Sequence, residues 1–328
     1  MKDRILERLQ RGGYVSGEEL GRALGISRTA VWKHISRLKR EGYRIHSIPS
    51  RGYCLASTPD RLFPQEIKAG LQTHTLGQEI IYFKEISSTQ EAAKSFAERG
   101  NPEGTIIISE IQLGGKGRIG REWSSPAGGI YFSIILRPDI RPTEASRFPL
   151  TTGLAVARAI EAMTDFHPQL KWPNDVIVND RKVCGILTDL SAEMDRLNWI
   201  VIGPGLNVNT TRDSFPREVG ETATSLFIEG GRQVSRVMLL QGILYELESL
   251  YEQYQATGFE PIRERWKARS NTLGAQVEIT FGAERKSGRA VDIDPDGALI
   301  LQKDDGSTER IVAGDVSLRN VKRQSGAG

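Results

Sequence analysis

The first feature of the sequence that could do chemistry is a loop rich in glycine and positive charge. Residues 114–123, GGKGRIGREW, hold four glycines and the cations Lys116, Arg118 and Arg121, soon after a β-branched run. The spacing G-x-G-x-x-G is that of a dinucleotide loop, but Pro126 and the glycines after it exclude the helix into which such a loop must open. We therefore predict a strand-loop-strand clamp for an anion, with a glycine-rich surface turn as the alternative.

A second group of polar residues lies in LKWPNDVIVNDRKVCGIL. Lys171, Asn174 and Asp175 stand at the end of one short strand, and Lys182 begins an apolar strand after a hairpin. An unpaired cation is costly in such a strand, so we predict that Lys182 faces a bound anion. Asp175, with Asn174, carries the oxygen ligands that Mg²⁺ prefers.

Two further segments place hydrogen-bonding groups or open backbone where strands end. In ISSTQEAAKSF, Ser88, Thr89 and Gln90 lie where a helix begins, although capping alone would explain Ser88. In IVIGPGLNVN, two glycines and Asn207 form a backbone that a ligand could approach closely. Trp123, at the end of the glycine-rich loop, could stack on a purine ring.

The elements that position these residues belong to an ordinary core-forming protein. The chain has 328 residues, 38% hydrophobic and 26% charged, which is enough for two or three domains. No apolar run is long enough to cross a bilayer and the N-terminus is charged, so we expect a cytoplasmic protein. Two distant cysteines and four histidines without ligand spacing argue against a disulfide framework or a structural metal site.

Basic residues are concentrated in the first 64 positions. This segment has 13 Lys and Arg against 6 Asp and Glu, whereas the rest of the chain is net acidic. Three helical patterns fit there: a stripe led by Ile5, a segment with Ser16 and Glu19 at capping-box spacing, and a helix in RTAVWKHISRLKREG, residues 28–42, capped by Ser27. The local excess of positive charge predicts a nucleic-acid-binding region.

The third helix and the segment after it predict how DNA is bound. Val31, Ile35 and Leu38 share one face of this helix, and the opposite face is polar and cationic. YRIHSIPSRGYCL predicts a two-stranded ribbon, which completes a winged helix-turn-helix. A solvated basic surface is the alternative. The DNA-binding residues we expect are Arg28, Thr29, Lys33, Ser36, Arg37 and Arg51.

The C-terminal part is expected to be a small β-domain. A long amphipathic helix at 237–258 precedes the segments AQVEITF, RAVDI, ALILQ and RIVAG, which alternate as short strands around the turn DPDG. We predict a small β-barrel. A stabilising cap and direct contact with nucleotide or carrier protein both remain open as its role.

Taken together, these motifs give the chain a family resemblance. The loop GKGRIGREW is similar to the G-R-G-R-x-G-R-x-W of bifunctional biotin–protein ligases that repress the biotin operon, and KWPND, RKVCGIL and IGPGLNVN follow in that family's order. The resemblance runs nearly end to end. It implies an α+β multidomain fold: a winged helix-turn-helix at 1–64, a class II synthetase-like biotin-ligase core at 65–270, and an SH3-like β-barrel at 271–328.

The resemblance also implies a reaction. Biotin and ATP would form biotinyl-5′-AMP, and biotin would then pass to a lysine of the biotin carboxyl carrier protein. Arg118 would bridge the biotin carboxylate and the α-phosphate, and Lys182 would neutralise charge on the attacking carboxylate and on the mixed anhydride. The residues implied in biotin binding are Ser88, Thr89, Gln90, Gln112, Lys116, Gly117, Arg118 and Lys182. Those implied in ATP binding are Gly115, Arg118, Arg121, Trp123, Lys171, Asn174 and Asn207. Asp175 would orient Mg²⁺ or the incoming lysine.

Three residues depart from the family pattern. Lys116 replaces a common arginine, Ile119 stands where a basic or polar residue is frequent, and Pro204 stiffens the Gly-x-Gly segment. We expect these changes to affect ligand affinity and loop order more than the reaction itself.

The resemblance further implies that biotinyl-AMP acts as corepressor, by promoting a homodimer that places two winged units on operator DNA. Two rival functions remain open at this stage. One is an effector-binding transcription factor without ligase activity, and the other is a related lipoate–protein ligase.

Overall fold

The computed structural model describes residues 1–194, 196–281 and 284–318. The chain separates into two compact units, Met1–Arg61 and Leu62–Gly328. Helix α4, Pro64–Ala69, lies at the start of the second unit. Among the described residues, no helix combines the length and the apolar character that crossing a membrane requires.

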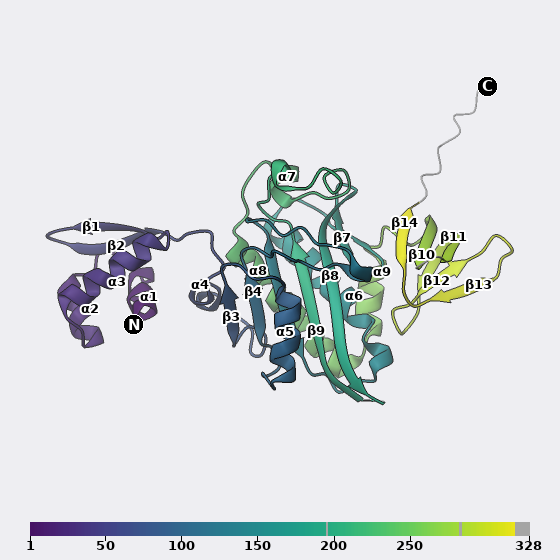
Figure 1. The fold of residues 1–328 in the computed structure, drawn as a ribbon, viewed down its shortest axis with the longest axis horizontal. Helices are drawn as coiled ribbons and strands as arrows, with labels where there is room; N and C mark the ends of the chain where they lie inside the picture. Colours follow the sequence, from purple (N-terminus) through teal and green to yellow (C-terminus); the bar gives the residue numbers. More distant parts are fainter. Residues whose placement is uncertain (195, 282–283, 319–328) are drawn as a thin grey trace, which may run out of the picture. The chain divides into compact units, whose positions relative to one another are not determined.

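The first unit is a winged helix-turn-helix, as the sequence predicts (Figure 1). Ser16 and Ser27 cap the second and third helices by accepting hydrogen bonds from the backbone N–H groups of Glu19 and Ala30. Gly25 ends the second helix in the left-handed conformation, with φ 67°. The elements are α1 (Lys2–Gln10), α2 (Gly17–Leu24), α3 (Arg28–Arg40), β1 (Arg44–Ile48) and β2 (Gly52–Ser57), the two strands pairing antiparallel.

The second unit is built on a seven-stranded sheet in the order β3-β4-β5-β9-β8-β7-β6. Strands β3 and β4 are parallel, and every other neighbouring pair is antiparallel. Strands β8 and β9 form the long hairpin at the centre of Figure 1. The strands are β3 (Ile80–Phe83), β4 (Ile106–Ser109), β5 (Ile130–Leu136), β6 (Gln169–Lys171), β7 (Asp175–Val178), β8 (Arg181–Glu193) and β9 (Arg196–Leu206).

Helices cover both faces of this sheet, and side-chain alternation along the strands decides which residues each face receives. On one face, Ile135 and Val201 pack against Ala93 of α5 (Thr89–Glu98). On the other face, Ile134 and Ile202 join the large core with α6 and α8. The remaining helices are α6 (Arg147–Met163), α7 (Leu226–Gly230), α8 (Arg236–Thr257) and α9 (Glu260–Lys267), with short 3₁₀ turns at Arg118–Gly120, Pro142–Glu144 and Arg212–Ser214.

The C-terminal part is a five-stranded antiparallel sheet in the order β13-β12-β11-β10-β14. The four predicted strands are present, and β14 was not predicted. Within the described residues, no pairing closes β13 onto β14, so the closed barrel stays a prediction. Residues 319–328, the end of the expected domain, lie outside the described residues. The strands are β10 (Gln276–Phe281), β11 (Glu284–Ile293), β12 (Leu299–Gln302), β13 (Thr308–Ile311) and β14 (Asp315–Leu318).

Candidate ligand site

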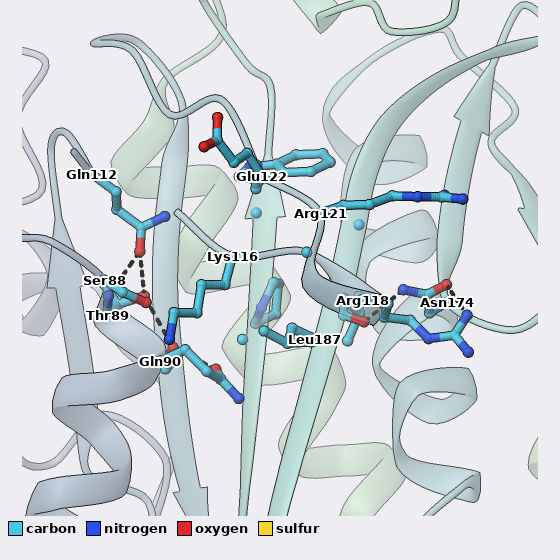
Figure 2. A pocket seen from close by; sticks show the side chains of 18 of the residues that line it. Ser88, Thr89, Gln90, Gln112, Lys116, Arg118, Arg121, Glu122, Asn174 and Leu187 are labelled. Atoms are coloured by element: carbon cyan, nitrogen blue, oxygen red, sulfur yellow. Dashed lines mark hydrogen bonds between the residues drawn. The ribbon is translucent and has the colours of Figure 1, made fainter. Parts of the chain in front are cut away.

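A cavity opens on the sheet face that α5 covers, beside the first turn of that helix (Figure 2). Its walls come from the start of α5, the glycine-rich loop, the strands β5, β8 and β9, and the connection before β7. Most of the ligand-binding residues predicted from the sequence line it: Ser88, Thr89, Gln90, Gln112, Lys116, Gly117, Arg118, Arg121, Trp123, Asn174, Asp175 and Lys182.

One side of the cavity is a network of neutral hydrogen bonds. Gln112 Oε1 accepts bonds from the backbone N–H and the hydroxyl of Thr89, at 2.8 and 3.0 Å, while Gln112 Nε2 donates to Ser125 Oγ at 2.9 Å. Ser88 is the N-cap of α5 and accepts a bond from the N–H of Glu91. These bonds fix the orientation of the Gln112 amide, because its oxygen and its nitrogen each have a partner.

Gln90 extends this network onto the central strands. Its Oε1 accepts a hydrogen bond from Ser133 Oγ at 3.0 Å, and its Nε2 donates to Asp189 Oδ2 at 2.9 Å and to the carbonyl of Val201 at 3.1 Å. Ser133 and Asp189 were not predicted. Ser133 carries a usable signal, since it is the single polar side chain facing the cavity in an otherwise apolar strand, IYFSIIL.

Glycines at alternating strand positions form the floor. A Cβ atom on Gly203 would lie 2.2 Å from Gln90 Oε1, and one on Gly205 would lie 2.4 Å from Trp123 Nε1. Gly185, opposite Gly205 in the β8–β9 ladder, lies 3.0 Å from the end of Lys182 by the same measure. Any larger residue at 203 or 205 would therefore displace the side chains that wall the cavity.

Cations line the other side of the cavity (Figure 2). Arg118 Nη1 donates to Asn174 Oδ1 at 3.3 Å and to the carbonyl of Gly314 at 3.2 Å. Arg121 forms an ion pair with Asp315 at 2.5 Å. Burial lowers the pKa of Arg118. The carboxylate of Asp315, the first residue of β14, therefore faces the two arginines of the glycine-rich loop.

Lys182 enters the same cavity from the β7–β8 hairpin. Its ammonium lies 2.7 Å from Asp175 Oδ1 and 5.1 Å from the centre of the Trp123 ring. The indole N–H of Trp123 is buried and has no hydrogen-bond partner among the described residues. Arg118 and Lys182 thus come from two separate strand connections to one cavity.

The glycine-rich loop itself contains one strained position. Ile119 adopts φ 54° and is 55% exposed, although a β-branched residue disfavours this left-handed conformation. At the start of the loop, Lys116 Nζ donates to Glu91 Oε1 at 2.9 Å, and this bond lowers the pKa of Glu91. The loop is thereby tied to α5 by a partly exposed ion pair.

Three predicted residues do not line the cavity. Gly115 faces an adjoining open groove, and a Cβ there would lie 2.4 Å from the carbonyl of Trp123, so the glycine serves packing within the loop. Lys171 lies opposite Asp175 in the backbone ladder of β6 and β7, and burial lowers the pKa of Lys171. Asn207 is buried and donates to the carbonyl of Thr224, while its Oδ1 has no partner in the described part of the chain.

The arrangement suits binding and charge neutralisation more than covalent catalysis. Cys184 alternates with the cavity-facing Gly185 and belongs to the core on the opposite face, where burial raises the pKa of its thiol. For the described residues, no cluster of three or more His, Cys, Asp or Glu could hold a metal ion. A metal bound here would need oxygen ligands from a substrate.

The winged unit presents the residues predicted to bind DNA. Arg28, Thr29, Lys33, Arg37 and Arg51 are exposed, and Ser36 is half-buried. Arg37 also forms an ion pair with Glu41 at 3.0 Å. The guanidinium of Arg51, in the turn of the wing, lies 4.4 Å from the centre of the Tyr14 ring.

Three family models match the chain in sequence. A helix-turn-helix domain model covers residues 2–54, the biotin/lipoate A/B protein ligase family model covers residues 82–207, and a biotin protein ligase C-terminal domain model covers residues 272–319. The matches follow the order of the winged unit, the sheet that carries the cavity and the C-terminal strands.

Relatives match over nearly the whole chain. The bifunctional ligase/repressor BirA of Bacillus subtilis is 38% identical, with 93% of this chain and 94% of the relative covered. BirA of Escherichia coli is 30% identical over 98% of each chain. The structure of biotin protein ligase from Aquifex aeolicus with biotin and ATP superimposes with a TM-score of 0.64 and 31% identity, covering 74% of this chain and 99% of that one.

A winged helix-turn-helix followed by a biotin-ligase core and a C-terminal β-domain defines a class of two-function proteins. The chain belongs to the family of bifunctional biotin–protein ligases and repressors. The resemblance seen in the loop and strand motifs is confirmed.

Proposed function

We propose that this chain activates biotin with ATP, transfers it to a lysine of the biotin carboxyl carrier protein, and represses transcription when biotinyl-5′-AMP is bound. In this assignment residues 1–64 bind DNA, residues 65–270 catalyse the reaction, and residues 271–328 complete the site. The observation that carries the proposal is the shared cavity of Arg118 and Lys182 beside a neutral hydrogen-bonding network.

The neutral side of the cavity holds the ureido ring of biotin. An amide-like ring with both N–H donors and a carbonyl acceptor matches the side chains found there, which offer hydroxyl and amide groups in fixed orientations. Ser88, Thr89, Gln90 and Gln112 take this role, with Ser133 as an addition from the structure. Lys116 and Gly117 close the loop over the bound vitamin.

The cationic side brings two anions together. The biotin carboxylate must approach the α-phosphate of ATP against mutual repulsion, and Arg118 and Lys182 supply positive charge on both sides of the reacting atoms. As the carboxylate oxygen attacks phosphorus, the bond to pyrophosphate breaks and the negative charge gathers between these two residues. Fixed cations stabilise that charge more than they stabilise the separated substrates.

The nucleotide occupies the remaining wall. Trp123 stacks on the adenine, and Arg121 and Asn174 contact phosphate and ribose. Lys171, Gly115 and Asn207 act from behind the cavity wall by supporting these contacts. When the nucleotide binds, its phosphate replaces Asp315 as the partner of Arg121.

The oxygen donors of the cavity fit a magnesium ion held jointly with phosphate. Asp175 and Asn174 line the cavity, and Mg²⁺ binds through one or two carboxylates together with substrate phosphates. When bound, the ion would neutralise phosphate charge. Asp175 already orients Lys182 by their ion pair and can also orient the incoming lysine of the carrier protein.

The winged unit makes the second function possible. Phosphate contacts from its cations supply affinity for operator DNA, and α3 reads bases in the major groove. Biotinyl-5′-AMP favours a homodimer that presents two such units to a two-fold operator.

Pyrophosphate release tests the ligase function. We expect release that requires biotin and ATP together, and transfer of labelled biotin to a carrier domain in the same reaction. Replacing biotin with lipoate should abolish both signals. If no pyrophosphate is released with biotin, the function still consistent with the chain is a transcription factor without ligase activity. Equal pyrophosphate release with lipoate would favour a lipoate ligase.

Sedimentation tests the regulatory part. In analytical ultracentrifugation we expect dimers with biotin and ATP together and monomers with either alone. The same assembly state under all conditions would contradict the proposed corepressor role.

A further inference from the structure

Trp32 on α3 differs from the other tryptophans of the chain. Its surface is 58% exposed, whereas Trp172, Trp199 and Trp266 are buried in the cores of the second unit. Trp123 is half-buried against the ligand cavity. A single exposed apolar side chain is common on protein surfaces and does not by itself indicate a binding site. The position of Trp32 on its helix gives this one a meaning.

Trp32 lies at the edge of the strip of α3 that is expected to enter DNA. At about 100° per residue, it follows Arg28 and precedes Ser36 by one turn each. Its neighbours Thr29 and Lys33 complete the strip, and both are exposed. The buried side chains of the same helix, Val31 and Leu38, point away from this strip into the core of the winged unit.

A contact with the wing shows which side of the strip Trp32 occupies. Lys39 Nζ donates to Ser47 Oγ of β1 at 2.9 Å. Lys39 lies seven residues after Trp32, close to two helical turns, so both side chains project toward the same side of α3. Trp32 is therefore placed between the polar strip and the wing, on the surface that a winged unit turns toward the duplex.

The charge of the surroundings identifies the partner. Exposed cations flank the indole at Arg28, Lys33 and Lys39, in a segment with 13 basic and 6 acidic residues. A cationic rim around an apolar centre complements DNA, whose phosphates border the apolar thymine methyl groups of the major groove.

We propose that Trp32 is a sequence-reading residue whose indole packs against the C5-methyl group of thymine in the operator. This inference rests on the proposed repressor function and adds to it a specific base contact. The cations of α3 position the helix on phosphates, and Trp32 distinguishes thymine from other pyrimidines.

Thymine methyl groups can be removed one at a time to test this contact. The full chain, with biotin and ATP, first selects a duplex from random-sequence DNA. Each thymine of that duplex is then replaced by deoxyuridine. We expect at least one replacement to weaken binding of the wild-type chain about fourfold, as loss of one buried methyl group implies.

Variants of Trp32 complete the cycle. Trp32→Ala should bind the selected duplex about tenfold more weakly, lose the sensitivity to deoxyuridine, and keep the wild-type dependence on salt, because no phosphate contact is removed. Trp32→Phe should retain part of the sensitivity, since its ring still reaches the methyl group. Wild-type pyrophosphate release by both variants verifies that the ligase unit folds, and an unchanged salt dependence of DNA binding verifies that the winged unit folds.

The possible failures are distinguishable. If the wild-type chain selects no duplex, the proposed repressor function fails and this inference fails with it. If selection succeeds but Trp32→Ala keeps the deoxyuridine sensitivity, only the inference is overturned. It is also overturned if the variant loses dimers in ultracentrifugation while its sequence preference is unchanged, because Trp32 would then contact a second copy.

Discussion

The neutral and cationic sides of the cavity are built from different kinds of structure. Gln90 lies in the first turn of α5 and is held by strand residues, whereas Gln112 is held by residues at the start of α5 and after the glycine-rich loop. All amide atoms of the two side chains have protein partners. Arg118 and Arg121 lie instead on a loop, and Lys182 follows a hairpin. Their partners are Asp315, Asp175, Asn174 and a backbone carbonyl.

The neutral side is therefore preorganised for the ligand, whereas the cationic side exchanges protein partners for ligand groups. Breaking a buried amide network costs about 1–3 kcal/mol for each group left without a partner, so the neutral side keeps its geometry with or without ligand. Partly exposed ion pairs contribute about 0–1 kcal/mol, so an incoming anion can displace a carboxylate from a cation at small cost. The cavity thus has a fixed side for recognition and an exchangeable side for the reaction.

The largest effect is expected on the cationic side. Arg118→Ala should lower the rate constant of pyrophosphate release by about 10²–10³-fold, because the lost guanidinium acts on charge that develops in the transition state. Arg22→Ala, which removes an exposed arginine paired with Glu18, is the matched control and should leave the rate unchanged. A loss below about fivefold for Arg118→Ala would contradict the division between the two sides.

The neutral side should respond through binding. Gln112→Ala leaves the Thr89 N–H without its partner and removes the bond that Ser125 accepts, so we expect biotin to bind about 10- to 100-fold more weakly in calorimetry. Gln241→Ala removes comparable bonds to the end of α4 and should lower the melting temperature without changing biotin affinity. Equal biotin affinity in both variants would show that the network serves stability alone.

The floor of the cavity connects the two sides. Gly205→Ala places a methyl group 2.4 Å from Trp123 Nε1 and must displace the ring, so the KM for ATP should rise about tenfold. Gly242→Ala in α8 meets Ala159 at 3.6 Å and should be neutral or stabilising by up to about 1 kcal/mol. An unchanged KM in Gly205→Ala would remove Trp123 from the nucleotide site.

The smallest effect tests exchange directly. Asp315→Asn removes the carboxylate that competes with phosphate for Arg121, so the KM for ATP should fall about two- to fivefold. Asp304→Asn, at an exposed turn of the same sheet, should have no effect. A higher KM in Asp315→Asn would mean that this carboxylate holds the loop in place and is not displaced by the nucleotide.

Local patterns predicted the parts of the molecule that depend on local physics. Ser16 and Ser27 cap the helices that their positions predicted, and apolar periodicity placed the core of the winged unit. The glycine-rich loop and the hairpin with Lys182 could be recognised for the same reason, since each is a short segment with an unusual combination of charge and apolar surroundings.

Contacts between distant segments could not be predicted in this way. Asp315 reaches the loop from nearly two hundred residues further along the chain, and Asp189 contacts Gln90 through strand register. Gly115, Lys171 and Asn207 carry suitable residue types but lie outside the cavity, because spacing alone does not say which wall a side chain faces.

Strand β9 presents alternate residues to the cavity side and to the core side of the sheet. Val201, Gly203 and Gly205 face α5, whereas Ile200 and Ile202 face the core beneath. Deleting one residue before Gly203 would reverse this phase, exposing branched apolar side chains to the ligand and turning the glycines into the core. Insertions or deletions in pairs would keep the phase, so length variation in this hairpin should be tolerated in even steps and rejected in odd ones.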